Sequence, residues 1–566
     1  MAHASRPRSM EDLEDTLRRI DGRGYPAYRD LKGSWVLRTH PDGAPRLVLH
    51  VDRVQADPYA PPSLVRVGID TSTADLPHDL IQDLPGRVAT ADFMLRAIAG
   101  ELSHDSTGVH AGTPTQEIIE RSGVVITEHG VEARLSVPLP ADRRRVLGRR
   151  ADELLLDVLP NAVGRYLRAD GLDLEALRSH VDSYRDQLVL QSLLPQHGLV
   201  GFVPDGAVLP RASGDSELPL NTGTPFRSPD SLRVTLELPS GRSLTGLGIR
   251  KGVTVVIGGG FHGKSTLLRA LIRGVHPHIE GDGREFVLSI ADAVSIRAED
   301  GRSVTDVDIS PFIGRLPSGT DTQHFSTPNA SGSTSQAASI VESLEAGATT
   351  LFLDEDTCAT NFIMRDDVMR GLVTAEPITP FVERIDELTA AGVSTVLVVG
   401  GSSAFLPHAD TVISMDAYVP SDVTEAAHAA TQGPTATDRD PLPATAGRVL
   451  ARDGLAPEAS RGKRARPPAA KGRGVIRMGE ATLDATATGV VDHEQTEGVA
   501  RALAWLEANG TGRTLARAVG HLAKKLEQEG LAALTADRDH PGQVALPRAA
   551  DVAAAANRYR RLRIQP

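Results

Sequence analysis

A glycine-rich stretch near the middle of the chain has the residue types and the spacing of a phosphate-binding loop. Its members are Gly258, Gly259, Gly260, Phe261, His262, Gly263, Lys264, Ser265 and Thr266. The apolar run 253–257 precedes them and the apolar-periodic segment 267–272 follows, so the pattern predicts a strand, a loop and a helix. In such a loop the backbone N–H groups surround phosphates, Lys264 contacts the terminal phosphates, and the Ser265 hydroxyl ligates Mg²⁺. The sequence therefore predicts a nucleotide site with ATP and Mg²⁺ as cofactors.

A second set of candidate catalytic residues follows about ninety residues later, at the end of the apolar run 349–353. In a parallel sheet the carboxylates of Asp354 and Glu355 would stand at the carboxyl edge, beside the phosphate loop. We expect Asp354 to hold Mg²⁺ through water and Glu355 to polarise the attacking water. Asp356 is expected to cap the turn or to support the other two acids. Together with Lys264, Glu355 is the predicted catalytic residue of an ATP hydrolase.

Small polar residues and a glycine lie between these two sets, just before the helical pattern 340–345. Such residues at a helix N-terminus form an anion site. In ABC-type ATPases a loop of this kind presses onto the γ-phosphate bound by the opposite protomer. Ser331, Gly332 and Ser333 resemble that signature, and the 23 residues from Ser331 to Asp354 fit the ABC arrangement. A Ser/Thr-rich surface loop is the alternative, against which the order and spacing of the three motifs argue.

The chain resembles one family closely, the ABC-class ATPases, which are soluble single-chain proteins distinct from transporter subunits. The resemblance covers about residues 10–420 and rests on five stretches, 206–214, 259–268, 281–285, 330–338 and 354–362. It implies an ABC-like nucleotide domain preceded by a dedicated N-terminal domain. Some relatives are linked to RNA binding, so the resemblance also suggests nucleic acid as a partner.

The sequence departs from ordinary ABC proteins at one catalytic position. In those proteins a histidine at the end of a late strand contacts the γ-phosphate, whereas here the run 394–399 is followed by Gly400 and Gly401. Ser402 and Ser403 are alternative hydrogen-bond donors, and His408 lies just beyond them. The substitution predicts slow turnover.

Three further positions have open roles. Residues 312–317, with Arg315 as a charge contact, are either a nucleotide-sensing loop or a plain connection. Phe226 is the candidate for stacking on adenine, although a buried strand residue is the commoner role of such a phenylalanine. A histidine at position 262, inside a phosphate loop, is usually a solvated donor.

Composition limits the class of protein and its compartment. The 566 residues suffice for two to four domains. The single cysteine, Cys358, excludes an intramolecular disulfide, which favours a reducing cytoplasm and a packing role for this residue. No apolar stretch approaches the ~20 residues needed to span a bilayer, and the amino terminus lacks the apolar run of a secretion signal. We therefore expect a cytoplasmic protein without a membrane-spanning segment.

Basic segments offer candidate nucleic-acid contacts in a chain whose net charge is −12. One is the Pro/Ala/Gly-rich stretch with Arg461, Lys463, Arg464, Arg466, Lys471, Arg473 and Arg477. Two more are the arginines of 143–150 and an expected basic helix over 556–563. The stretch is equally explained as a solvated linker and the helix as a solvated face, and for the arginines of 143–150 a charged helix face is the commoner explanation.

The fold class expected is an α/β P-loop NTPase core of the ABC type, with an N-terminal α+β domain and a smaller, mainly helical C-terminal region. Helical spacing over 11–20 and apolar runs at 35–38 and 46–51 belong to the N-terminal domain. The expected divisions are a flexible tail (1–9), the N-terminal domain (10–200), the ABC-class ATPase domain (201–420), a basic, partly disordered linker (421–473), and a C-terminal domain for nucleic-acid binding or dimerisation (474–566).

The function expected is a soluble ATPase in which two chains sandwich ATP and form a homodimer that opens and closes. Binding of RNA, or of DNA, would be coupled to this switch. The alternative is a nucleotide-sensing interaction module that turns over little ATP and recruits a protein partner. A small-molecule kinase is a weaker third possibility, since it would leave the loop at Ser331 without a role.

Overall fold

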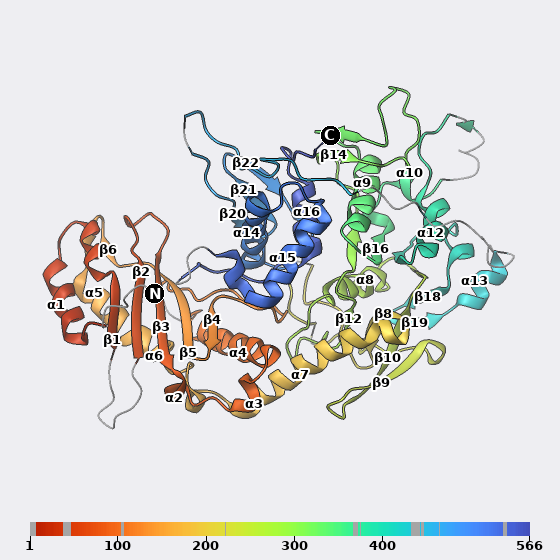
Figure 1. The fold of residues 1–566 in the computed structure, drawn as a ribbon. Coiled ribbons are helices and arrows are strands. Elements are labelled where there is room, and N and C mark those ends of the chain that lie inside the picture. Colours follow the sequence, from red (N-terminus) through yellow and green to blue (C-terminus); the bar gives the residue numbers. More distant parts are fainter. Residues whose placement is uncertain are drawn as a thin grey trace. The chain divides into compact units, whose positions relative to one another are not determined.

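The computed structural model describes residues 7–37, 47–103, 107–214, 216–220, 222–365, 372–373, 375–431, 442, 447–462, 464–535 and 540–565. The chain forms two compact units (Figure 1). The first contains Met1–Arg185 and Glu529–Leu546, and the second contains Asp186–Gln528 and Pro547–Pro566. Helix α7 (Leu174–Leu193) carries the chain from one unit into the other. No helix in the described part of the chain is both long and apolar enough to cross a membrane.

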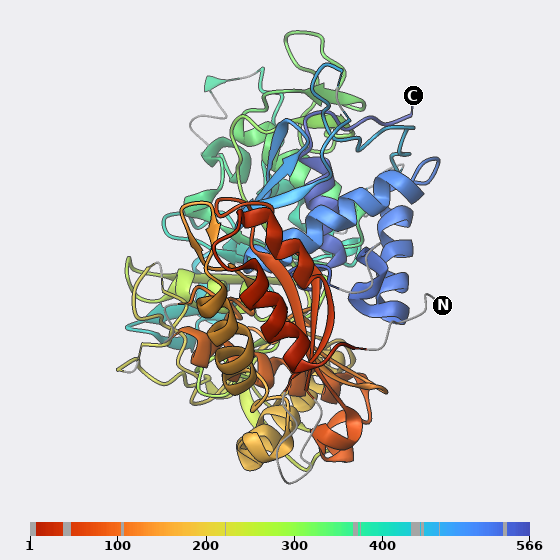
Figure 2. The same ribbon diagram turned by 90° about the vertical axis from the view of Figure 1, so that its left-hand side faces the viewer.

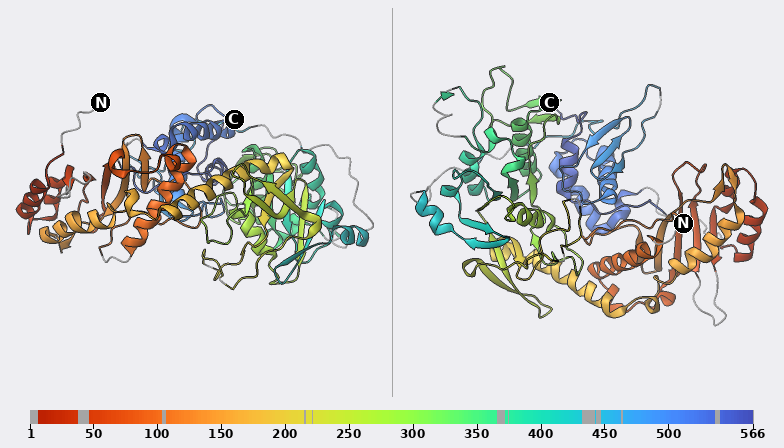
Figure 3. Two further views of the ribbon diagram at one scale, coloured as in Figure 1. Left: turned by 90° about the horizontal axis from the view of Figure 1, so that it is seen from below. Right: turned by 180° about the vertical axis from the view of Figure 1, so that it is seen from behind.

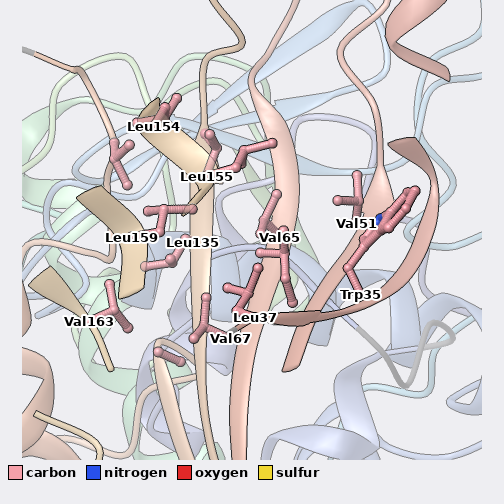
Figure 4. Close-up of a cluster of buried hydrophobic side chains, with 14 of the residues drawn as sticks. Trp35, Leu37, Val51, Val65, Val67, Leu135, Leu154, Leu155, Leu159 and Val163 are labelled. Carbon is pink, nitrogen blue, oxygen red and sulfur yellow. The ribbon is translucent and has the colours of Figure 1, made fainter. Parts of the chain in front are cut away.

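The first unit is built on a five-stranded antiparallel sheet of order β1-β2-β3-β5-β4. The strands are β1 (Gly33–Leu37), β2 (Leu47–Arg53), β3 (Ser63–Asp70), β4 (Val124–Thr127) and β5 (Gly130–Val137). Alternate residues of β3 are buried, as expected for a sheet with one covered face. Side chains of β1, β2, β3 and β5 meet those of residues 154–163 in the core (Figure 4).

Helices complete this first unit. They include α1 (Met10–Ile20), α2 (Thr71–Ala74), α3 (His78–Ile81), α4 (Leu84–Ser103), α5 (Gly148–Asp152), the π-helical turn Glu153–Val158 and α6 (Leu159–Ala162). Helix α1 begins at a capping box, in which the Ser9 hydroxyl accepts from the Asp12 N–H and the Asp12 carboxylate accepts from the Ser9 N–H. Its apolar residues Leu13, Leu17 and Ile20 are buried, and α1 lies beside α5 (Figure 2).

The second unit is centred on a six-stranded sheet of order β13-β16-β17-β11-β18-β19. These strands are β11 (Val253–Gly258), β13 (Val294–Ile296), β16 (Thr350–Asp354), β17 (Ser394–Val398), β18 (Thr411–Asp416) and β19 (Val419–Asp422). All pairs are parallel except β18 with β19, which form a hairpin. Strands β11, β16 and β17 are almost wholly buried, as expected when both faces of a sheet are covered.

A smaller antiparallel sheet and several helices surround this sheet. The sheet has the order β12-β8-β10-β9, with β8 (Leu199–Pro204), β9 (Arg233–Glu237), β10 (Ser243–Arg250) and β12 (Leu288–Ser289), and a separate pair is β14 (Val304–Val307) with β15 (Phe325–Thr327). The helices are α8 (Lys264–Arg273), α9 (Gly332–Glu345), α10 (Thr360–Ile363), α12 (Phe381–Ala390) and α13 (Thr424–Ala430).

The C-terminal part of the second unit contains a sheet as well as helices, so the expectation of a mainly helical region was incomplete. Its three strands are β20 (Ala469–Gly472), β21 (Val475–Met478) and β22 (Ala481–Asp484), and its helices are α14 (His493–Asn509), α15 (Leu515–Glu529) and α16 (Ala549–Asn557). Helix α14 packs on the strands, and α16 lies between α14 and α9 (Figure 3).

Part of the expected linker is ordered. Residues 432–441 and 443–446 lie outside the described residues, but from position 447 onward the chain packs into the second unit. Arg448 and Leu450 are buried, and strand β20 begins at Ala469. An ion pair between Arg448 and Glu345, which are far apart in the sequence, holds this segment in place. The polar composition of the segment did not indicate this pair.

Candidate nucleotide site

The glycine-rich loop connects β11 to α8, as the sequence predicts. Gly258 has φ +140° and Gly263, which caps α8, has φ +98°. A Cβ atom on Gly258 would lie 2.4 Å from the Met415 carbonyl oxygen, and one on Gly263 would lie 2.6 Å from a ring carbon of Tyr418. Both the backbone conformation and the close neighbours therefore require glycine at these positions.

Lys264 is the first residue of α8, and its ammonium group crosses the loop. Its Nζ donates to the carbonyl oxygens of Gly258 at 2.6 Å and Gly259 at 2.8 Å. Phosphate oxygens are stronger, charge-assisted acceptors than these carbonyls. Ser265 and Thr266 follow in the first turn of α8, where the backbone N–H groups have no partner inside the helix. This arrangement can bind the phosphates of a nucleotide.

Asp354 stands at the carboxyl end of β16, at the same edge of the sheet as the phosphate loop. Strand β17 separates β16 from β11, so the two motifs are one strand apart. Asp354 Oδ1 accepts from the Asp356 N–H at 3.2 Å. The turn is thus capped by the side chain of Asp354, with Asp356 supplying the backbone donor.

Glu355 is held by the end of β17. Its Oε2 accepts from the Gly400 N–H at 2.5 Å and from the Gly401 N–H at 3.2 Å. The two residues that replace the expected histidine therefore fix the candidate catalytic carboxylate through their backbone. The sequence does not predict this role, because every residue type except proline carries a backbone N–H donor. The alternative donor His408 instead contacts Asp386, with 2.9 Å between Nδ1 and Oδ2.

The loop at Ser331 is attached to the segment that follows Glu355. Ser331 caps α9, with its Oγ 3.4 Å from the Thr334 nitrogen. The Ser333 hydroxyl donates to Asn361 Oδ1 at 2.8 Å, and Gln336 Oε1 accepts from the Ala359 N–H at 2.9 Å. Among the hydrogen bonds and ion pairs of the described residues, none joins the loop 331–333 to the phosphate loop of the same chain.

Cys358 lies in this same segment and acts as a packing residue. Burial raises the pKa of its thiol to about 12, and a hydrogen bond with Gln336 only partly opposes this shift. The thiol is therefore protonated at neutral pH, which removes the nucleophilic thiolate that a redox sensor needs.

Two other candidates lie outside the site. Phe226 is 3 % exposed and belongs to the core formed with β8 and α8, so its ring cannot stack on a nucleotide. In the segment 312–317, Phe312 is buried, the Gly314 N–H donates to the Pro377 carbonyl at 2.7 Å, and Arg315 is exposed. This geometry is that of a surface connection.

The basic helix expected over 556–563 is wrong, because α16 ends at Asn557. The following arginines bind other parts of the second unit. Arg558 donates to both carboxylate oxygens of Glu299, at 3.0 and 2.5 Å, and Arg560 donates to the carbonyls of Pro328 and Gly301. Tyr559 is buried, with its hydroxyl on the Ala456 carbonyl. These groups serve the fold and leave no free basic helix.

Other basic residues remain exposed. In the Pro/Ala/Gly-rich stretch these are Arg461, Arg464, Arg466, Lys471 and Arg473, whereas Arg477 is partly buried in β21 and Lys463 lies outside the described residues. In the first unit they are Arg143, Arg144, Arg145, Arg149 and Arg150.

Three family models match consecutive parts of the chain. One described as the N-terminal part of the ATPase of the ABC class matches residues 10–170, and the P-loop domain of the ABC ATPases matches residues 173–449. The chain belongs to the ABC-class ATPases. The C-terminal part of this ATPase, residues 469–565, matches the C-terminal domain of MRB1590.

A curated relative is similar to part of this ATPase. The uncharacterized protein MJ1628 of Methanocaldococcus jannaschii is 28 % identical over 218 residues, which are 37 % of this chain and 48 % of that protein. The chain thus spans about half the length of the curated relative that it matches.

Two solved structures are also similar to part of the chain. One is MJ1267, an ATP-binding cassette of an ABC transporter in its ADP conformation, with 14 % identity, 39 % of this chain and 89 % of that chain covered, and a TM-score of 0.24. The other is cbiO1 from Clostridium perfringens, part of the ABC transporter complex cbiONQ, with 15 % identity, 40 % and 87 % covered, and a TM-score of 0.25.

Proposed function

We propose that this ABC-class ATPase is an ATP-driven switch in which two chains enclose ATP and form a homodimer. The observation that carries the proposal is the placement of the loop 331–333, which has no described contact with its own phosphate loop. A helix N-terminus that carries small hydroxyl residues suits a γ-phosphate presented by another molecule. Each phosphate loop would then face the loop 331–333 of the second chain.

We assign the hydrolytic roles to residues of this site. Lys264 and the backbone of the phosphate loop bind the phosphates, and Glu355 accepts a proton from the attacking water. The Ser265 hydroxyl and the Asp354 carboxylate are oxygen ligands of the kind that Mg²⁺ prefers, so this donor set fits the ion. When bound, Mg²⁺ neutralises charge on the phosphates.

The hydrogen bonds around α9 supply a route for coupling. Gln336 and Ser333, just inside α9, hold Ala359 and Asn361, which follow Glu355 by only a few residues. Movement of the loop 331–333 against the second chain's ATP would therefore shift the segment next to the catalytic carboxylate. Hydrolysis and opening of the dimer would be linked through this segment.

We further propose that RNA, or DNA, is the partner of the closed state. The exposed arginines and lysine of residues 461–473 support this proposal, since they lie close together in the sequence and can contact phosphates without base specificity. One of them, Arg473, also pairs with Glu217 at 3.3 Å. A reducing cytoplasm is the compartment that we propose, given the single cysteine.

The alternative function is a nucleotide-sensing module with little turnover that recruits a protein partner. The absence of a histidine at Gly400 and Gly401 favours it, because no side chain there can contact the γ-phosphate. Hydrolysis by wild type, with and without single-stranded RNA at two salt concentrations, separates the two functions. RNA-stimulated turnover that weakens at high salt supports the switch, whereas background turnover that RNA leaves unchanged supports the sensor.

The dimer itself is tested by light scattering of Glu355→Gln with ATP and Mg²⁺, because a hydrolysis-deficient variant would accumulate the closed state. We expect the mass of two chains with ATP and of one chain without it. A Ser331→Arg change in the same variant should restore the single-chain mass while ATP still binds. A single-chain mass for Glu355→Gln at saturating ATP would contradict the sandwich.

A further inference from the structure

The groups that recognise the nucleobase are not among the phosphate-binding motifs. Phe226, the upstream aromatic, is buried and unavailable. Among the described residues, three large apolar side chains are exposed at or next to the phosphate loop, namely Phe261 (100 %), Tyr418 (37 %) and Val419 (44 %). Apolar side chains left exposed beside a polar ligand site are candidates for contact with the apolar part of that ligand.

Tyr418 lies in the turn of the β18–β19 hairpin. Strand pairing runs from Asp416 to Val419, and the two residues between them have left-handed backbones, with φ +46° at Ala417 and +69° at Tyr418. Two consecutive left-handed residues are typical of a type I′ turn, in which glycine or asparagine is preferred. A tyrosine in this conformation costs roughly 1 kcal/mol, and such strain concentrates at ligand sites.

The turn is attached directly to the phosphate loop. The Tyr418 N–H donates to the His262 carbonyl at 3.0 Å. His262 Nδ1 lies 3.0 Å from the Ala417 nitrogen and 2.8 Å from Asp416 Oδ1, and it can bond one of them at a time, as acceptor or as donor. The Tyr418 ring packs over Gly263, where even a Cβ atom would approach it to 2.6 Å. Tyr418 is therefore positioned by the same loop that binds the phosphates.

The sheet order places this turn on the side of the loop away from Glu355. Strand β11 has β17 on one side, whose end holds Glu355, and β18 on the other, which leads into Tyr418. The γ-phosphate must approach Glu355 for hydrolysis, so the base at the other end of the nucleotide extends away from it. A partly exposed ring on the β18 side lies where the base is expected.

We propose that Tyr418 is the platform on which the adenine ring of ATP stacks, held in place by the His262 backbone and Gly263. This inference rests on the proposed binding of ATP in the phosphate loop. Tyr418 is favoured over Phe261 because the Phe261 side chain is fully exposed, with no packing that would fix its ring. Stacking reads the flat face common to all bases, so purine nucleotides other than ATP should bind with similar affinity.

The test compares the affinities of ATP and of inorganic tripolyphosphate, which has the phosphates and no base. Base–aromatic stacking is worth ~1–3 kcal/mol, so Tyr418→Ala should weaken ATP binding by about 5- to 100-fold and leave tripolyphosphate within about 2-fold of wild type. Tyr418→Phe should bind ATP as wild type does. Asparagine suits the left-handed turn, so Tyr418→Asn removes the ring and keeps the hairpin. Its affinities for ATP and tripolyphosphate should match those of the alanine variant. Tyr59→Ala, at a tyrosine of the first unit that is 84 % exposed, is the matched control.

Two results would overturn the proposal. A parallel loss of ATP and tripolyphosphate in Tyr418→Ala and Tyr418→Asn would mean that the turn only shapes the phosphate loop. Unchanged ATP affinity in both would mean that the base lies elsewhere. If wild type bound neither ATP nor tripolyphosphate, the proposed function itself would fail, which is a different outcome from either.

Discussion

At the scale of single residues, the carboxylate of Glu355, the proposed catalytic base, is oriented by main-chain donors. Glu355 Oε2 receives hydrogen bonds from two consecutive N–H groups, those of Gly400 and Gly401. This arrangement fixes one carboxylate oxygen, and in the proposed mechanism the carboxylate accepts the proton of the attacking water. The two glycines that hold the proposed base stand where a histidine that contacts the γ-phosphate was expected.

Glu355→Gln should therefore lower kcat for ATP hydrolysis by at least ~100-fold, because the amide cannot accept the proton of the attacking water. The amide oxygen still accepts from the Gly400 N–H, so ATP affinity should stay within a few-fold of wild type. Steady-state hydrolysis and equilibrium binding of labelled ATP measure the two effects. A variant that kept a tenth of wild-type turnover would show that another group is the base.

At the scale of elements, a buried arginine joins the segment after residue 447 to α9. Arg448 pairs with Glu345 at 2.6 and 2.8 Å and also donates to the Thr305 carbonyl and to Asn557 Oδ1. Its backbone N–H donates to the same carboxylate at 2.7 Å. One guanidinium thus connects β14, α9 and α16, whose positions are far apart in the sequence.

Arg448→Met should destabilise the second unit by ~3–5 kcal/mol, because it leaves the Glu345 carboxylate buried without its cation. Urea unfolding followed by the fluorescence of Trp505, which lies in α14 of this unit, measures the loss. The double variant Arg448→Met with Glu345→Met removes both charges and should recover part of the stability. Equal stability of Arg448→Met and wild type would show that water compensates the lost pair.

Several helices and strands were predictable from local sequence patterns, whereas the long-range ion pairs were not. Apolar runs ending in glycine or acids predicted β11, α8 and β16, and the spacing of Leu13, Leu17 and Ile20 predicted α1, because these signals are local. Arg448 lies in the segment that was expected to be a linker, and Arg558 lies in the stretch that was expected to be a basic helix. Their partners, Glu345 and Glu299, lie more than a hundred residues away, and no local pattern announces such pairs.

At the scale of the whole molecule, the chain passes between the two units three times, because residues 529–546 return to the first unit. The Ser122 hydroxyl donates to the Gly542 carbonyl at 2.7 Å and accepts from the Val544 N–H at 2.9 Å. His540 Nε2 lies 3.1 Å from the Leu135 carbonyl of β5, and its Nδ1 accepts from the Gly542 N–H at 3.0 Å. The first unit is therefore completed by sequence near the other end of the chain.

His540 makes this unit sensitive to acid. Its two hydrogen bonds need a neutral ring with the proton on Nε2, and burial lowers its pKa from 6.5 to about 4. In the unfolded chain the His540 ring binds a proton below pH 6.5, whereas in the folded chain it binds one only below about pH 4. The stability that the neutral ring contributes is therefore fully present above pH 6.5 and falls as the pH drops from 6.5 to 4. We expect the titration of His540 to lower the free energy of unfolding by about 2 kcal/mol between pH 7 and pH 5.

Urea unfolding at pH 7 and pH 5, followed by the fluorescence of Trp35 in β1, measures this loss. His540→Gln lacks a group that titrates in this range, so its stability should change by about 2 kcal/mol less than that of wild type. The difference between the two proteins isolates His540 from the other acids and bases of the unit. Identical pH dependence in both would show that the folded ring is protonated.

The most direct test of the two-chain sandwich mixes two inactive variants. Lys264→Ala disables the phosphate loop and Ser331→Arg disables the loop that faces the partner's ATP, so each variant alone should hydrolyse almost no ATP. In a dimer of one chain of each kind, both defects fall on one site, and the other site has an intact Lys264 facing an intact Ser331. Only a mixed dimer holds a complete site, so equal amounts of the two should hydrolyse ATP several-fold faster than the sum of the two variants measured alone. Turnover of the mixture that only equals the sum of the two variants measured alone would contradict the sandwich.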